Sequence, residues 1–268
     1  VDPFDPDPSF SLDCTNPSLT LEAHSTIRTT DSYVVEEIEY TFPNYFPTGF
    51  GTPQVISTDD VWADSWTTLP FNFCFYGTSY TEVLIGANGM ITFDSANIAG
   101  SSCGYAFDDN LPSTTGALFN ETIYGAYHDI DPTGLTNPTE SWIEGTEGCR
   151  KFITAWRGVP MFGDATVSRE YTGMIVLHET TNIIEVFIEN KRIENGNNFP
   201  WNDGNAIVGL QGNASAGEAI TAPCRNGLDT KSENILKCVS TMIRPYSLSL
   251  QNGVIIQKIL IGLMFFLS

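Results

Sequence analysis

Basic side chains are scarce in this chain of 268 residues. Twelve Lys and Arg stand against 32 Asp and Glu, which gives a formal net charge of −20. Contact with nucleic-acid phosphates needs clustered Lys and Arg, so the composition argues against a nucleic-acid partner. It argues equally against binding to an anionic membrane surface. The charge is typical of an extracellular protein that meets divalent cations.

The chain also lacks any C-x-x-C pair, which argues against a zinc ribbon or a thioredoxin-like motif. Its six cysteines are widely spaced, at Cys14, Cys74, Cys103, Cys149, Cys224 and Cys238. An even number of cysteines in such an acidic chain predicts disulfides and an oxidising compartment, and buried free thiols are the alternative. We expect a bridge among Cys74, Cys103 and Cys149, with Cys74–Cys103 as the first choice.

Long apolar runs and helical stripes are absent as well. The longest uninterrupted apolar stretch near the end is Ile259–Leu267, and a membrane span needs about 20 such residues. We therefore expect no membrane span. No window of a dozen residues has the 3.6-residue period of an amphipathic helix. Aromatic residues reach 12%, with 23 Gly and 15 Pro, a profile typical of many short strands joined by turns.

A period of two residues is present from Ser9 onward. Phe71, Phe73 and Phe75 alternate with less apolar residues, which predicts a strand with one buried face. Asn88-Gly89 lies between two apolar runs and predicts a hairpin. Further strands are expected at 33–40, 152–156, 172–178, 183–188 and 206–210. The predicted fold is an all-β, antiparallel two-sheet sandwich, braced by disulfides.

The domain boundaries follow from composition. Residues 1–8 are rich in Pro and Asp and predict an extended linker, which suggests that the domain is one module of a longer, multidomain chain. The sandwich is expected over residues 9–227. Residues 228–268 are interpreted as a tail outside it, because the balance of charge turns from acidic to basic after Cys224.

Several segments together resemble a known family of large secreted Bacteroidetes proteins, those that carry a gliding-motility-associated C-terminal sorting domain. The segments are Ser57–Trp62, Leu69–Gly77, Val83–Phe93, Ile123–Pro132, Glu179–Val186 and Asn202–Gln211. Their order and spacing agree over roughly residues 9–226. The middle of the chain more distantly resembles the extracellular domain of nidogen, through Tyr127–Asp131 and the strands that follow.

This resemblance implies a non-catalytic module displayed on the bacterial cell surface, for adhesion or gliding, with export by the type IX secretion system. It implies surface glycans or other surface proteins as partners, and no catalytic residues. The second hypothesis is a carbohydrate-binding module that acts on extracellular glycans. Trp62, Trp66 and Trp201 lie near expected turns and are the candidate ligand-binding residues, although aromatic side chains commonly pack in a core.

A third and weaker hypothesis is an esterase-like hydrolase. Gly100–Gly104 has the G-x-S-x-G pattern of a nucleophile elbow, which requires a strand before the serine and a helix after it. The sequence that follows is a poor helix start, so a loop is the preferred interpretation. His24, His128 and His178 have no metal-ligand spacing.

The candidate cofactor is calcium. Asp129 and Asp131 are two residues apart, so on a strand they would share one face and converge on an ion. Calcium needs six to eight oxygen ligands, and Asp59, Asp108 and Asp109 are candidate further donors. The alternative is that these aspartates cap turns, since the spacing lacks the full pattern of a calcium-binding loop.

Overall fold

The computed structural model describes residues 30–38, 51–105, 109–116, 118–163, 170–191, 205–227 and 237–245. Within these ranges the regular elements are β-strands and one short 3₁₀-helix, η1 (Ala214–Ala216). None of the described residues forms a helix with the length and apolar character that a bilayer crossing requires. The predicted all-β class is confirmed.

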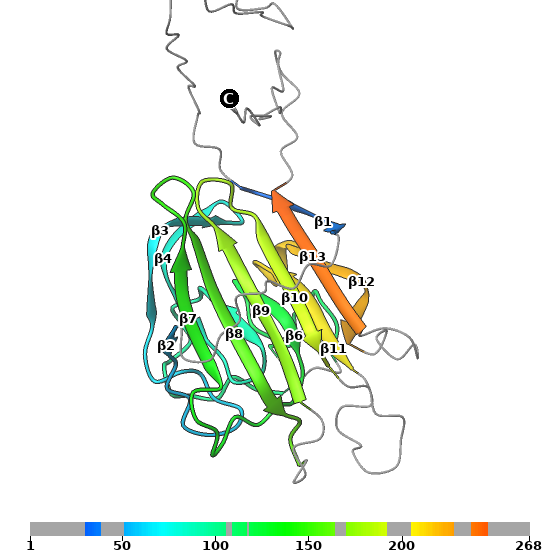
Figure 1. Ribbon diagram of the computed structural model, residues 1–268. Helices are drawn as coiled ribbons and strands as arrows, with labels where there is room; N and C mark the ends of the chain where they lie inside the picture. Colours follow the sequence, from blue (N-terminus) through cyan, green and yellow to red (C-terminus); the bar gives the residue numbers. More distant parts are fainter. Residues whose placement is uncertain are drawn as a thin grey trace, which may run out of the picture.

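One sheet has seven strands and faces the viewer in Figure 1. Its strands, in spatial order, are β1 (Tyr33–Glu37), β13 (Lys237–Pro245), β10 (Ile184–Asn190), β9 (Glu170–His178), β8 (Lys151–Pro160), β7 (Thr139–Glu144) and β2 (Thr52–Pro53). All of its pairings are antiparallel, so consecutive strands β7 to β10 form a meander of hairpins.

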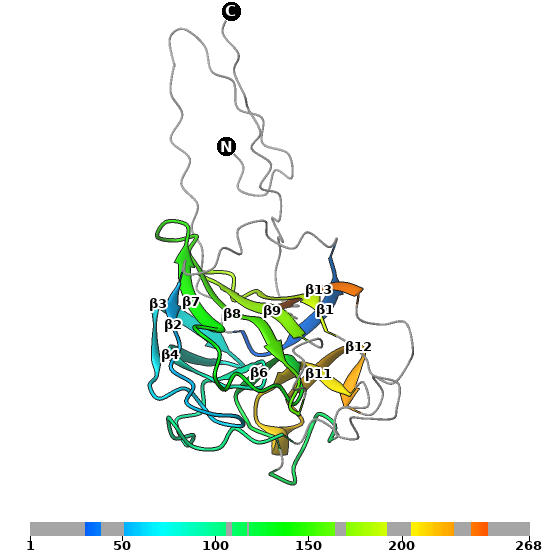
Figure 2. The same ribbon diagram turned by 60° about the horizontal axis from the view of Figure 1, so that its bottom comes forward.

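The second sheet has six strands, and it lies behind the first in Figure 1 and below it in Figure 2. Its order is β12 (Ala219–Gly227), β11 (Ala206–Gln211), β6 (Thr122–Tyr127), β5 (Met90–Thr92), β4 (Thr78–Ile85) and β3 (Thr67–Phe75). The two antiparallel sheets pack face to face, which confirms the predicted sandwich.

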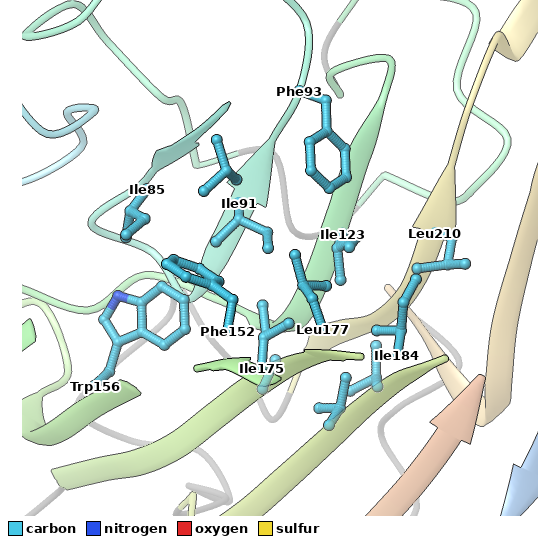
Figure 3. Packing of buried hydrophobic residues seen from close by; sticks show 14 of the residues in the cluster. Ile85, Ile91, Phe93, Ile123, Phe152, Trp156, Ile175, Leu177, Ile184 and Leu210 are labelled. Carbon is cyan, nitrogen blue, oxygen red and sulfur yellow. The ribbon is translucent and has the colours of Figure 1, made fainter. Parts of the chain in front are cut away.

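The core between the sheets is built from alternate residues of both. Phe71, Phe73 and Phe75 on β3 are buried while Asn72 is exposed, as the period of two predicts. Figure 3 shows side chains of β5, β6 and β11 pointing toward those of β8, β9 and β10. The sheets approach closely at Gly125, where an added Cβ would lie 2.7 Å from the side chain of Ile175.

The predicted hairpin at Asn88-Gly89 is present, although its turn is wider than expected. Strands β4 and β5 pair as predicted, and Gly86 N donates to Met90 O at 2.9 Å to close the loop. Gly89 has a φ of +76°, which favours glycine. Asn88 is completely buried, and its side chain forms hydrogen bonds with other loops, which are described below. The residue therefore has a structural role beyond forming the turn.

The tail boundary predicted at residue 227 needs correction. Strand β13 (Lys237–Pro245) lies inside the seven-stranded sheet, paired on one side with β1 and on the other with β10. Residues 237–245 therefore belong to the sandwich. The change of charge misled the sequence interpretation because backbone pairing depends little on the charge of outward-facing side chains. Residues 1–8 and 246–268 lie outside the described residues.

The predicted Cys74–Cys103 bridge is not formed. Cys74, Cys103 and Cys149 are all free. Cys74 lies on β3, where its Sγ accepts a hydrogen bond from Thr30 N at 3.2 Å. Cys103 is buried in a separate apolar cluster with Trp62, so the two thiols belong to different environments.

Candidate functional site

Three aspartates gather where the turn before β3 meets the segment that follows β6. Asp59 and Asp60 form a turn ahead of β3, and Asp129 follows β6. Each offers a carboxylate oxygen that lies within 4.8 Å of the other two. Asp129 is buried, with 4% of its surface exposed, while Asp59 and Asp60 are half-buried. We call Asp59, Asp60, Asp129 and the neighbouring Asp131 the aspartate cluster.

Repulsion and burial act together on the cluster. The pKa of Asp59 is raised to about 7, first by burial and then by the charges of Asp60 and Asp131. The pKa of Asp129 is also raised to about 7, by burial and by Asp60, Asp59 and Asp131. Burial raises the pKa of Asp60 as well, although Asn88 opposes this by donating a hydrogen bond. Like charges this close disfavour the ionised state unless a cation balances them.

Asn88 fixes the positions of the surrounding loops. Its Nδ2 donates to Asp60 Oδ1 at 2.7 Å and to Gly104 O at 2.9 Å, while its Oδ1 accepts from Ile130 N at 3.1 Å. The amide thus connects the turn at Asp60 with the segment that carries Asp129. Asp60 itself has a φ of +54°, a left-handed conformation that Asp tolerates better than most residues.

The remaining candidate ligands behave differently. Asp131 Oδ1 accepts from Thr133 N at 2.8 Å, so this carboxylate caps a turn as well as adding charge to the cluster. Asp109 does not join the cluster, because its Oδ2 accepts from Ser113 Oγ at 2.8 Å and Thr115 Oγ1 at 3.2 Å. Asp108 lies outside the described residues. The sequence prediction did not include Asp60. Because Asp60 directly follows the candidate donor Asp59 in the chain, it could have been considered as a further ligand.

The G-x-S-x-G pattern is a loop. Ser102 forms an isolated bridge with Val61, and none of the described residues at 103–105 and 109–116 is helical. Its Oγ accepts from Gly104 N at 3.2 Å. The two histidines that the structure describes contact other groups: His128 Nδ1 lies 2.5 Å from Ala126 O, and His178 Nε2 lies 2.7 Å from Glu185 Oε2. Cys103 follows Ser102 in the chain. Burial raises the pKa of its thiol to about 12, so the thiol is protonated at neutral pH and is not a nucleophile.

The three candidate tryptophans have separate outcomes. Trp62 is completely buried, and its indole packs on Gly86, where an added Cβ would lie 3.0 Å from the ring. It is therefore a core residue, contrary to the prediction of an exposed ligand-binding side chain. Trp66 is half-buried and lines a cleft of about 580 Å³, together with Trp142. Trp201 lies outside the described residues.

The comparison with protein families gives one match. The sequence model of the family described as NIDO related matches residues 32–238, which is most of the chain. The chain belongs to the NIDO-related family. The match supports the more distant of the two resemblances seen in the sequence, the one to nidogen. It also extends past residue 227 into β13, in agreement with the corrected boundary.

The other two comparisons add no relatives. No curated protein and no solved structure matches the chain. The aspartate cluster and the cleft both lie within the NIDO-related region, and so does the whole of the described core except the end of β13.

Proposed function

We propose that this NIDO-related sandwich is a non-catalytic, extracellular module of a larger bacterial surface protein, used for attachment or gliding. The observation that carries the proposal is the family match over residues 32–238, which covers nearly the whole sandwich. The resemblance to Bacteroidetes surface proteins supports display on the cell exterior by the type IX route. The loop geometry of Ser102 supports a role without catalysis.

Antibody labelling of intact cells of the organism that makes the protein tests the location. We expect labelling without permeabilisation, and loss of the signal when protease is added outside the cells. Labelling that appears only after permeabilisation would refute the extracellular assignment. A catalytic role is tested separately with a chromogenic acetate ester. Turnover that disappears in Ser102→Ala would show that the domain is a hydrolase.

We also propose that the aspartate cluster binds calcium. Its supporting observation is the convergence of three carboxylates within 4.8 Å, with Asp59 Oδ1 buried and lacking a hydrogen-bond partner. Calcium prefers carboxylate and carbonyl oxygens, and one backbone carbonyl, Gly104 O, accepts from the same Asn88 amide that donates to Asp60. A divalent ion would favour the ionised form of the carboxyl groups and replace the repulsion among them by attraction. The ion would then link the segment that follows β6 to the turn before β3.

Thermal unfolding with calcium and with chelator tests this site. A ligand present at about one hundred times its dissociation constant stabilises the folded state by about 2.7 kcal/mol. We expect a gain of that size for the native chain and no gain for Asp129→Asn combined with Asp131→Asn. Asp31→Asn combined with Asp64→Asn, which removes the same two charges from exposed aspartates outside the cluster, is the matched control. Equal melting temperatures with calcium and with chelator for the native chain would refute the site.

A further inference from the structure

The cleft that contains Trp66 lies along one open side of the sandwich. It is bordered by the edge strand of each sheet, β2 in the seven-stranded sheet and β3 in the six-stranded one. Figures 1 and 2 both show β2, β3 and β7 along the same side of the molecule. A volume of about 580 Å³ is within the range of small-molecule sites in proteins.

The lining of the cleft carries no charge. Its walls are formed by hydroxyl, amide, aromatic and aliphatic side chains, and not one Asp, Glu, Lys, Arg or His is among the described residues that line it. In a chain of net charge −20, this makes the cleft chemically distinct from its surroundings. A charged ligand would lose hydration there without gaining a partner, so the cleft favours a neutral ligand.

The polar groups of the cleft are held in place by one another. Gln54 Nε2 donates to Ser141 Oγ at 2.8 Å, and Gln54 Oε1 accepts from Thr67 Oγ1 at 3.0 Å. Trp142 also borders the cleft, but only 8% of its surface is exposed, because its ring packs with Ile153 and Ala155 in a separate apolar cluster. A ligand that binds here therefore orders few side chains, which lowers the entropic cost of binding.

The edge strands themselves are poor acceptors of an added peptide strand. Strand β2 is only two residues long and includes Pro53, and β3 includes Pro70. Proline lacks the N–H that a neighbouring strand would need, and it commonly protects a sheet edge from pairing. The chemistry of the cleft therefore favours a ligand recognised through its own hydroxyl groups and apolar faces over an extended peptide.

We infer that this cleft binds a neutral glycan. A pyranose face would contact Trp66, and the sugar hydroxyls would hydrogen-bond to the Gln54, Ser141 and Thr67 side chains. This inference rests on the proposed function, because it gives the extracellular module a ligand class. It also leaves Trp66 as the ligand-binding residue among the predicted tryptophans that the structure describes, because Trp62 is a core residue.

Calorimetric titration with uncharged hexasaccharides tests the inference. The probes are cellohexaose, xylohexaose and mannohexaose, with hexagalacturonate as the charged comparison. We expect at least one neutral probe to bind and the charged probe to bind at least about tenfold more weakly, which corresponds to about 1.4 kcal/mol. Absence of binding by every neutral probe at millimolar concentration would overturn the inference.

Three variants locate the binding. Trp66→Ala removes an aromatic face and Gln54→Glu replaces the amide donor by a carboxylate of nearly equal shape. Each should weaken binding at least about tenfold, a loss common for central aromatic and hydrogen-bonding groups. Tyr105→Ala, which removes an exposed aromatic ring outside the cleft, should leave it unchanged. Because Trp66 is half-buried, melting curves of all variants must be measured, and Gln54→Glu keeps the test decisive if Trp66→Ala unfolds.

Other outcomes would reassign the cleft. If neutral glycans bind but Trp66→Ala and Gln54→Glu bind them as the native chain does, the site lies elsewhere and the inference is wrong. If a Val- and Thr-rich peptide binds in place of every glycan, the cleft is a strand-docking groove and the inference is also wrong. Neither result affects the extracellular location, which the labelling of intact cells decides independently.

Discussion

The aspartate cluster and the cleft are supplied in part by the same short segment and yet have opposite chemistry. Residues 51–68 contribute Asp59 and Asp60 to the cluster, and Gln54 and Trp66 to the cleft. The cluster combines burial with four carboxyl groups, whereas no charged side chain is among the described residues that line the cleft. Between the two, Trp62 anchors the segment in the core. One loop can thus serve two unlike sites because a buried aromatic side chain holds its middle.

Replacing that anchor should have the largest effect. Trp62→Ala removes a completely buried indole, and such truncations cost about 3–5 kcal/mol. Denaturant unfolding measures the loss. Because Trp62 lies between the two sites, we expect both calcium and glycan binding to weaken in this variant. If either site kept its full affinity in the folded variant, the shared anchor would be the wrong explanation for the positions of the two sites.

Replacing Asn88 should separate the two sites. Asn88→Ala leaves the buried N–H of Ile130 without the Oδ1 that accepts from it, and an unsatisfied buried group costs about 1–3 kcal/mol. The carboxylate of Asp60 loses its amide donor at the same time. We expect lower stability and weaker calcium binding in titrations, with glycan affinity unchanged. A parallel loss of glycan affinity would mean that the two sites are coupled.

The pH should produce the smallest effect and act on one site only. The pKa of Asp59 and of Asp129 is about 7 in the folded chain, and burial is the main cause in both. In the unfolded chain a carboxyl group of Asp ionises near pH 3.9, so the folded state binds more protons between these values. Stability without calcium is therefore fully present at low pH and falls as the pH rises toward 7.

Melting temperatures in chelator, measured from pH 4.5 to pH 8, check this sign. We expect the native chain to melt a few degrees lower at pH 7.5 than at pH 5. Asp129→Asn should flatten the profile, and calcium should restore stability mainly at the higher pH because it competes with protons. Glycan affinity should stay constant over the same range, since no titratable side chain is among the described residues that line the cleft.

Local pattern was enough to predict much of the sandwich. The alternation of Phe71, Phe73 and Phe75 and the Asn88-Gly89 turn indicated β3 and the β4–β5 hairpin because both signals are confined to neighbouring residues. The place of β13 was not accessible in this way. Its position between β1 and β10 depends on hydrogen bonds between backbone segments that are distant in the sequence. Amino-acid composition does not indicate such pairings.

The candidate site shows the same division. The spacing of Asp129 and Asp131 indicated a carboxylate pair, while the approach of Asp60 depends on a left-handed residue and on Asn88. The contribution of Ser141 to the cleft could not be predicted, because β7 lies far from Trp66 in the sequence. The even number of cysteines suggested disulfides, but the number does not determine the distance between any two sulfur atoms. Cys74 and Cys103 lie in different environments.

The pairing of β1 with β13 has a consequence for how the chain folds. The register joins Tyr33 to Pro245, so the first described strand finds its hydrogen-bond partner at the last one. Contacts between segments so distant in sequence close a long loop and form slowly. During synthesis β1 must wait until almost the whole domain has emerged, so the seven-stranded sheet cannot be completed from its amino-terminal part. A chain of this topology remains incompletely folded while it is being made, and completes its sheet only after the end of the domain is released.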